Sequence, residues 1–278
     1  MIGAAGFVGR AVSDRLAASG GNVLRLSRAE VDLDAEAATG QLVERLKADD
    51  CVVIAAVKVP CRTSDMVVHN LTMMARIANA LKVQPVDHVV YVSSDAVYAD
   101  SDAPLTEASF KGPDNLYGIM QLAREVMLRD AVPASGLTFV RPTMIFGAAD
   151  PHGGYGPNQY FRLARAGKDI VLFGEGEERR DHVFIGDVAE IIARVVRQRS
   201  IGTINVASGE VHSFRAIAEQ VAALYDNRIR VTGTERTGPM PHGGYRPFDI
   251  GAIGAAFPDL RMMQLRQGIE RLHRDLNG

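Results

Sequence analysis

The chain has no tryptophan, only two cysteines and no marked excess of charge of either sign. Its 31 Lys and Arg nearly balance its 33 Asp and Glu, so the basic excess typical of nucleic-acid binders is missing. No apolar run approaches the roughly 20 residues that a membrane span needs, and the opening MIGAAGFVGR has no charged stretch that leads into an apolar one, as a secretory signal would. Cys51 and Cys61 form no Cys-x-x-Cys pair, which favours two thiols in a reducing compartment. We therefore expect a soluble cytoplasmic protein with neither a nucleic-acid nor a membrane partner.

Apolar, β-branched runs alternate with helical patterns in the first half of the chain. The expected strands cover residues 23–27, 51–57, 88–94 and 137–143, and the expected helices cover 8–18, 39–47, 65–81 and 115–130. Strands that are apolar almost throughout are typical of parallel strands covered on both faces. The alternation therefore predicts an α/β fold with a doubly wound parallel sheet, whose ligands bind beyond the carboxyl ends of the strands.

The second half has a different texture, because residues 148–157 and 234–247 are rich in Gly, Pro and His. Further helices are expected at 187–197 and 213–225. We expect a sheet domain from residues 1–145 with 183–207, and a smaller, discontinuous region from 146–182 with 208–278. Pro-His-Gly-Gly-Tyr occurs at both 151–155 and 241–245. Either the two loops are alike by coincidence, or both present His and Tyr to one polar ligand; two His alone do not predict a metal site.

A glycine-rich turn, Gly3-x-x-Gly6-x-x-Gly9, leads into the first expected helix at Phe7 and Val8. Glycines let the backbone approach a pyrophosphate, and the helix N-terminus offers N–H groups and a positive dipole end. The pattern therefore predicts a dinucleotide site. Such a turn should follow a buried strand of about five residues, yet only two residues precede Gly3. We expect that the coding start lies upstream and that the first strand is truncated.

The segment after the second expected strand bears on the choice of coenzyme. An acidic residue there would accept a ribose hydroxyl, as in NAD binders, whereas Ser27 and Arg28 suit a 2′-phosphate. We therefore expect NAD(P), with NADP favoured over NAD. The alternative is that Arg28 is a solvated loop charge. Asp32 and Leu33 could lie beside the adenine.

Five motifs occur together in a fixed order. They are the glycine turn, Val92-Ser93-Ser94-Asp95-Ala96-Val97-Tyr98, Tyr117-Gly118, Arg141-Pro142-Thr143-x-x-Phe146-Gly147, and Arg180-Asp181-His182-Val183-Phe184-Ile185-x-Asp187-Val188. Over nearly its whole length the chain resembles the extended short-chain dehydrogenase/reductase family, in particular its NAD(P)-dependent epimerase/dehydratase group, which acts on nucleotide sugars. The resemblance implies a Rossmann domain, a small substrate domain and a Ser/Thr–Tyr–Lys catalytic set.

The resemblance also assigns roles to individual residues. Ser94 and Tyr117 match the catalytic serine and tyrosine. The expected coenzyme contacts are Gly3, Gly6, Phe7, Val8, Gly9, Ser27, Arg28, Asp32, Leu33, Ala55, Ala56, Lys58, Asn70, Tyr117 and Gln121. The expected substrate contacts are Ser94, Asp95, Asn158, Arg180 and Arg246, within a polar set that also holds Arg141, Gln159 and Arg179. Arg180 matches the arginine that meets the phosphates of the sugar nucleotide.

One departure from the family pattern affects the chemistry. The pattern Tyr-x-x-x-Lys reads Tyr117-Gly118-Ile119-Met120-Gln121 here, so a neutral amide stands where an ammonium should. A free tyrosine has a pKa near 10 and needs nearby positive charge to act as a base at neutral pH. Lys58, just past an expected strand, is one candidate for the missing cation; the alternative is a solvated loop lysine.

We therefore expect an NAD(P)-dependent oxidoreductase or epimerase that transfers a hydride at a carbon of a nucleotide sugar, with Ser94, Tyr117 and Gln121 in the catalytic set. The alternative is a catalytically impaired NADP-binding protein, a sensor or a partner in a complex. In sugar dehydratases of the family that the chain resembles, the acid at the position of Asp95 is usually followed by Glu. Here Ala96 follows it, which weakens a dehydratase function. The resemblance also allows a homodimer through helices 65–81 and 115–130, although their apolar faces could equally be internal core.

Overall fold

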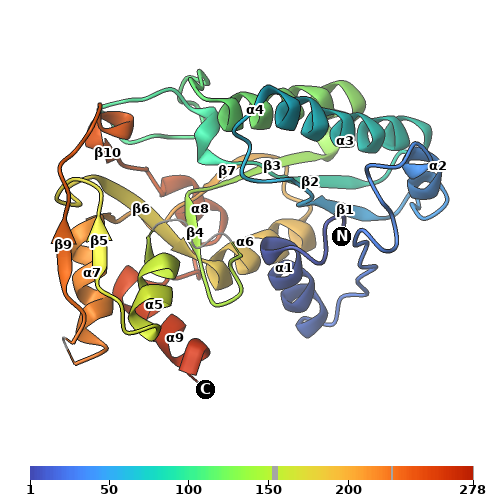
Figure 1. The fold of residues 1–278 in the computed structure, drawn as a ribbon. Coiled ribbons are helices and arrows are strands. Elements are labelled where there is room, and N and C mark those ends of the chain that lie inside the picture. Colours follow the sequence, from blue (N-terminus) through green and yellow to red (C-terminus); the bar gives the residue numbers. More distant parts are fainter. Residues whose placement is uncertain (152–155, 227, 278) are drawn as a thin grey trace. The chain divides into compact units, whose positions relative to one another are not determined.

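The computed structural model describes residues 1–151, 156–226 and 228–277 (Figure 1). The chain divides into two compact units. Unit 1 comprises Met1–Ala99, Glu107–Pro142 and Val188–Asn205, and unit 2 comprises Asp100–Thr106, Thr143–Asp187 and Val206–Gly278. Most of the first Pro-His-Gly-Gly-Tyr copy, residues 152–155, lies outside the described residues.

Unit 1 is built on a four-stranded sheet in the order β1-β2-β3-β7. Its strands are β1 (Cys51–Ile54), β2 (His88–Val92), β3 (Leu137–Pro142) and β7 (Gly202–Val206). β1 pairs with β2 and β2 with β3, both in parallel. Because helices connect these parallel strands, the chain has the α/β, Rossmann-type arrangement that the sequence predicts.

The edge of this sheet beyond β1 differs from the prediction. Ile2 forms isolated parallel bridges to Leu26 and to Ile54, and residues 23–27 form no regular strand. The expected strand 23–27 is therefore wrong apart from Leu26. A strand needs a partner to complete its hydrogen bonds, and the partner here, Ile2, bridges only Leu26 of this segment.

Helices cover both faces of this sheet (Figure 1). They are α1 (Phe7–Ala18), α2 (Ala38–Val43), α3 (Ser64–Val83), α4 (Leu116–Ala131) and α6 (Ile185–Gln198), with 3-10 turns η1 (Asp95–Val97) and η2 (Ala134–Gly136). Polar caps fix two of the starts: Thr63 Oγ1 accepts from Met66 N, and Asn115 Oδ1 accepts from Gly118 N. α2 ends at Val43, short of the expected 47.

Buried apolar side chains fill the space between this sheet and its helices. The buried set includes Ile54, Met74, Ile77, Val89 and Leu128, all with no more than 2% of their surface exposed. Burying such side chains contributes roughly 1.5–3 kcal/mol each, so this core holds the carboxyl ends of the strands in a fixed order. Cys51 and Cys61 are free thiols.

Unit 2 contains two small sheets and four α-helices among its described residues. One sheet has the order β10-β6-β4, with β8 also on β6, and the other pairs β5 with β9. Its elements are β4 (Met144–Phe146), α5 (Pro157–Arg165), β5 (Ile170–Leu172), β6 (Arg179–Phe184), β8 (Val211–Ser213), α7 (Phe214–Ala223), β9 (Val231–Gly233), η3 (Pro241–Gly244), β10 (Tyr245–Arg246), α8 (Gly251–Ala256) and α9 (Leu265–Asn277). Its core is separate from that of unit 1 and gathers residues such as Phe161, Ile217 and Leu272.

Within the described residues, none of the helices combines the length and the apolar character that crossing a bilayer requires.

Candidate functional site

The glycine turn closes tightly against the end of β1. Gly3 has a φ of +85°, and a Cβ there would lie 2.6 Å from the backbone N of Ala56. A Cβ on Gly9 would lie 2.0 Å from the carbonyl oxygen of Gly3. Only glycine fits at both positions, so the turn and the first residues of α1 lie directly at the carboxyl edge of the sheet. This is the geometry that a dinucleotide turn needs.

The loop after Leu26 holds several charges in a local network. The hydroxyl of Ser27 donates to Glu30, and Ser27 N donates to the same carboxylate at 2.7 Å. These hydrogen bonds lower the pKa of Glu30 below its usual value. Arg28 pairs with Asp32 and Asp34, each at 3.2 Å. The two groups expected to meet a 2′-phosphate are thus already engaged with carboxylates.

The loop after β1 is held by Asn70. Its side-chain amide accepts from Lys58 N at 2.8 Å and donates to Lys58 O at 2.9 Å and Met66 O at 2.9 Å. Asn70 is fully buried, so its role here is to fix the backbone that follows Ala55 and Ala56. The side chain of Lys58 is exposed.

Ser94 and Asp95 follow β2 at the same edge of the sheet. Ser94 is the N-cap of η1, where its Oγ accepts from Ala96 N at 3.1 Å and donates to Asp95 at 3.2 Å. Both residues are 7% exposed. A capping role and a role toward a ligand are compatible, because a hydroxyl oxygen has two lone pairs.

The start of α4 is pressed against η1. A Cβ on Gly118 would lie only 2.2 Å from the carbonyl oxygen of Ala96. This close approach brings the neighbouring residue, Tyr117, to the Ser94–Ala96 segment. Two motifs that lie 23 residues apart in the chain, from Ser94 to Tyr117, are therefore brought together by the absence of one side chain.

Gln121 occupies the position of the family lysine and is hydrogen-bonded on both sides. Its Nε2 donates to the Tyr117 hydroxyl at 3.0 Å, and its Oε1 accepts from the hydroxyl of Tyr91. Gln121 is 1% exposed, and Tyr91 is fully buried. Burial raises the pKa of Tyr91 well above its usual value, so that hydroxyl keeps its proton and remains a donor.

Sequence reasoning missed the next residue on this face of α4. Arg124 follows Gln121 by one turn, is fully buried, and lies with its guanidinium carbon 5.1 Å from the centre of the Tyr91 ring. The sequence held a signal for it, since residues 117, 121 and 124 have the spacing of one helix face. Nothing in the sequence, however, marks an arginine as buried.

A second buried arginine lies in unit 1. Arg141 donates to both oxygens of Glu125 at 2.8 and 2.7 Å and to the hydroxyl of Tyr98 at 2.7 Å. Ser93 also donates to Glu125, at 2.7 Å. With no exposed surface, Arg141 stabilises the fold and offers no face to a substrate.

In unit 2 the expected substrate residues fall into two places. Arg180 and Arg246 are register partners on β6 and β10. Arg180 pairs with Glu178 at 3.1 Å, and Arg246 donates to Asp100 at 2.9 Å. Side chains of register partners lie on one face of a sheet, so two guanidinium groups stand near each other, each beside a carboxylate.

His242, from the second Pro-His-Gly-Gly-Tyr copy, adjoins this pair. It contacts Asp100 and Arg246, and its φ is +54°. Asn158 is elsewhere engaged: it accepts from Gly147 N at 3.1 Å and donates to Gly147 O at 2.7 Å. Arg179 lies over the ring of Tyr245, 4.3 Å from its centre.

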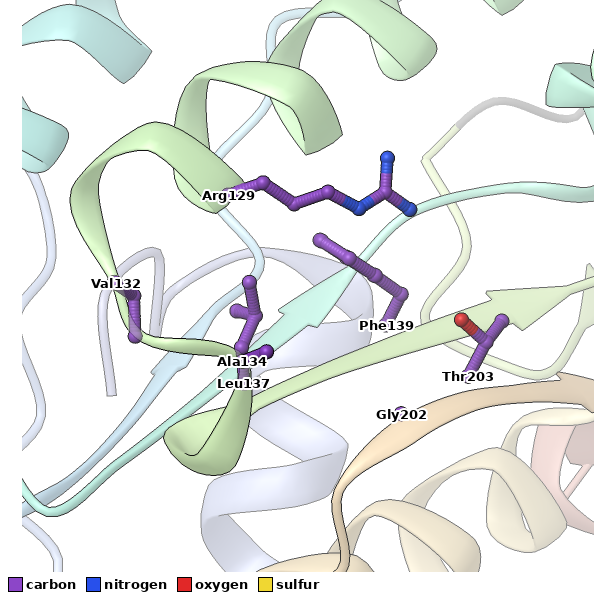
Figure 2. Close-up of a pocket in the computed structure, with 7 residues that line it drawn as sticks. All are labelled: Arg129, Val132, Ala134, Leu137, Phe139, Gly202 and Thr203. Atoms are coloured by element: carbon purple, nitrogen blue, oxygen red, sulfur yellow. The ribbon is translucent and has the colours of Figure 1, made fainter.

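A cavity of about 240 Å³ lies at the opposite edge of the unit 1 sheet. Its lining residues are Arg129, Val132, Ala134, Leu137, Phe139, Gly202 and Thr203 (Figure 2). Leu137 and Gly202 begin β3 and β7, so the cavity is at the amino ends of the strands and is separate from the glycine turn.

Solved structures with the same fold include three from bacteria. UDP-N-acetylglucosamine 4-epimerase from Bacillus cereus is 19% identical, with a TM-score of 0.82 over 100% of this chain and 98% of the other. RMD from Pseudomonas aeruginosa, complexed with NADPH, is 19% identical, with a TM-score of 0.84 over 99% and 96%. UDP-glucose 4-epimerase from Thermus thermophilus, complexed with NAD, is 20% identical, with a TM-score of 0.82 over 100% and 98%.

These likenesses show the fold. The sequence pattern of the NAD dependent epimerase/dehydratase family matches residues 1–207, about three quarters of the chain. With the glycine turn, the Ser94 segment and Tyr117 at one edge of a parallel sheet, the chain belongs to the NAD dependent epimerase/dehydratase family.

Proposed function

We propose that this protein is an NAD(P)-dependent oxidoreductase or epimerase that acts on a nucleotide sugar by hydride transfer at a sugar carbon. In this proposal unit 1 binds the coenzyme and unit 2 binds the substrate. The observation that carries it is the approach of α4 to η1, where the Gly118 backbone meets Ala96 and brings Tyr117 to the Ser94 segment. The two free thiols agree with the expected cytoplasmic location.

The residues at the edge of the sheet fit a nicotinamide coenzyme. The closed turn at Gly3 and Gly9 and the start of α1 suit its pyrophosphate. The bound coenzyme would supply the hydride acceptor or donor.

Tyr117 would move the proton of the reacting hydroxyl, and Ser94 would hold the same oxygen by a hydrogen bond. Because Gln121 donates to the Tyr117 oxygen, the proton of that phenol is not used in their bond. Arg180 and Arg246 would pair with the diphosphate of the sugar nucleotide, a task that suits the planar fork of a guanidinium.

The choice between NADP and NAD depends on Arg28. The sequence favours NADP, but Arg28 would have to exchange Asp32 and Asp34 for the 2′-phosphate. Exposed ion pairs of this kind contribute about 0–1 kcal/mol. We therefore propose that NADP is preferred over NAD by less than about tenfold, which corresponds to about 1.4 kcal/mol.

One observation favours a second function. Gln121 carries no charge, so the chain could bind the coenzyme without turnover, as a sensor or a partner in a complex. The two proposals differ in one measurable respect: only the enzyme consumes NADPH.

The test combines calorimetry with absorbance. Titration of NAD and NADP into the protein should give binding of both, and NADPH absorbance should fall on mixing with at least one member of a panel of keto-sugar nucleotides. A matched Tyr117→Phe variant should retain binding and lose about 10²–10⁴-fold in rate. Absence of binding would overturn both functions, and binding without turnover across the panel would support the second.

A homodimer is proposed through α3 and α4. Val68 on α3 is 63% exposed, and Ile119 and Val126 on α4 are 44% and 55% exposed. These apolar side chains lie on the two helices that the resemblance points to. Light scattering should give twice the chain mass for the native protein, and an Ile119→Lys/Val126→Glu variant should give the single mass.

A further inference from the structure

Arg124 carries a positive charge into the interior of unit 1 without a carboxylate to balance it. Its Nη2 donates to Ala56 O at 2.6 Å. Within residues 1–151, 156–226 and 228–277, its Nε and Nη1 are buried without a hydrogen-bond partner, and none of the acidic side chains there forms an ion pair with it. An arginine keeps its proton in any protein environment, so the charge remains.

A buried arginine without an acidic partner lowers the stability of the fold. Moving a charge out of water costs several kcal/mol unless it is paired and hydrogen-bonded. An apolar side chain of similar volume would fill the space without that cost. We therefore look for a role of this charge in the group next to it, the Tyr91 ring, whose centre lies 5.1 Å from the guanidinium carbon.

The Tyr91 hydroxyl begins a continuous chain of hydrogen bonds to Tyr117. Tyr91 donates to Gln121 Oε1, and Gln121 Nε2 donates to the Tyr117 oxygen at 3.0 Å. An amide that accepts at its oxygen becomes a better donor at its nitrogen, because hydrogen bonds in a chain polarise one another. Positive charge at Tyr91 thus strengthens the bond that Tyr117 receives.

We propose that Arg124 is a positioning residue that replaces the missing lysine: its buried charge acts through Tyr91 and Gln121 to favour the deprotonated form of Tyr117. The proposal rests on the proposed function, in which Tyr117 moves a proton. Lys58, the other candidate cation, is exposed, so water screens its charge.

Two acidic side chains, Glu125 and Asp95, lie on the elements that carry this chain of hydrogen bonds. Glu125, which follows Arg124 on α4, is neutralised by Arg141 at 2.7 Å and also meets Arg129 at 3.4 Å. Asp95, on the η1 turn packed against α4, accepts from Ser94. Among these groups only Arg124 adds a positive charge that has no acidic partner within the described chain.

The test measures the titration of Tyr117 directly and needs no substrate. Ring ¹³C-labelled tyrosine gives one signal per residue, and Tyr117→Phe assigns the signal of Tyr117. In Arg124→Met, the titration midpoint of Tyr117 should move to higher pH by about one unit, a tenfold change in the equilibrium. Tyr91→Phe should move it in the same direction, and Arg124→Lys should restore most of the native midpoint.

Arg129→Met is the matched control. Arg129, also on α4, lies over an aromatic ring too, with its guanidinium carbon 4.6 Å from the centre of the Phe139 ring (Figure 2). Phe139 has no hydroxyl, so it cannot join a chain of hydrogen bonds. This variant should leave the Tyr117 midpoint unchanged. A Gln121→Lys/Arg124→Met double variant returns the cation to the family position and should restore the native midpoint.

Circular dichroism first establishes that each variant is folded. An unchanged midpoint in both Arg124→Met and Tyr91→Phe overturns the proposal, as does an equal shift in Arg129→Met. Calorimetry with NAD and NADP on the same samples distinguishes failure of this inference from failure of the proposed function. Coenzyme binding with an unchanged Tyr117 midpoint removes only the role of Arg124. A changed midpoint without coenzyme binding removes only the proposed function.

Discussion

Unit 1 buries two arginines completely, and the two differ in the partners of their charge. Arg141 is held by a bidentate pair with Glu125 and by Tyr98, so its charge is cancelled where it stands. Arg124 has one backbone carbonyl and an aromatic ring. A buried charge that is paired supports the fold, whereas one left unpaired projects its field onto its neighbours. Arg141 is thus a structural cation, whereas Arg124 lies over Tyr91, whose hydroxyl is linked through Gln121 to the candidate catalytic Tyr117.

The largest expected effect follows from removing the paired arginine. Arg141→Met leaves Glu125 buried without its main partner and should lower the free energy of unfolding by roughly 3–5 kcal/mol. Chemical denaturation measures this change. The double variant Arg141→Met/Glu125→Met removes both charges and should regain most of the loss; if it does not, the pair is not what Arg141 contributes.

A buried basic group can also escape the cost of its charge by releasing its proton, as His182 in unit 2 does. Burial, aided by the nearby charge of Arg180, lowers the pKa of His182 from 6.5 to about 3. Below about pH 6.5 the unfolded chain binds a proton that the folded chain excludes until about pH 3. Stability should therefore fall as the pH is lowered through this window, by up to about 1.4 kcal/mol per pH unit.

Denaturation at pH 7 and pH 5 tests this expectation. His182→Asn should show a smaller loss of stability between the two pH values than the native protein, whatever its stability at pH 7. Equal losses in the two proteins would show that other groups cause the acid sensitivity.

The unpaired arginine should matter little for stability. Arg124→Met loses a cation–π contact of about 0.5–2 kcal/mol but also relieves an uncompensated buried charge, so the free energy of unfolding should change by less than about 1 kcal/mol. Denaturation of Arg124→Met beside Arg141→Met gives the comparison directly. Equal destabilisation by the two substitutions would remove the distinction between the two arginines.

An exposed arginine should show the smallest effect. Arg28 is shared between Asp32 and Asp34 at the surface. Arg28→Ala should reduce affinity for NADP by less than about tenfold and leave affinity for NAD unchanged. Calorimetry with both coenzymes measures it, and a much larger loss for NADP would show that Arg28 leaves its carboxylates to hold the phosphate.

Local signals predicted much of the helical structure. The expected helices 8–18 and 115–130 match α1 (Phe7–Ala18) and α4 (Leu116–Ala131) within one residue. Their periodicity and caps, such as Asn115, depend on residues close in the chain. The expected strand 23–27 is wrong because strand pairing depends on a distant partner, and Ile2 bridges only Leu26 there.

For the candidate site, motif spacing by itself identified Ser94, Tyr117 and the neutral Gln121, and the order of the motifs determined the family. Only the tertiary structure decided what surrounds Gln121. The Tyr91 hydroxyl reaches Gln121 from β2, and Arg124 lies over the Tyr91 ring from the next turn of α4. The burial of Arg124 depends on how the sheet and α4 pack. The physical reason is that the effect of a charge depends on its distance from the group it acts on and on its exclusion from water. The order of the residues along the chain determines neither quantity directly.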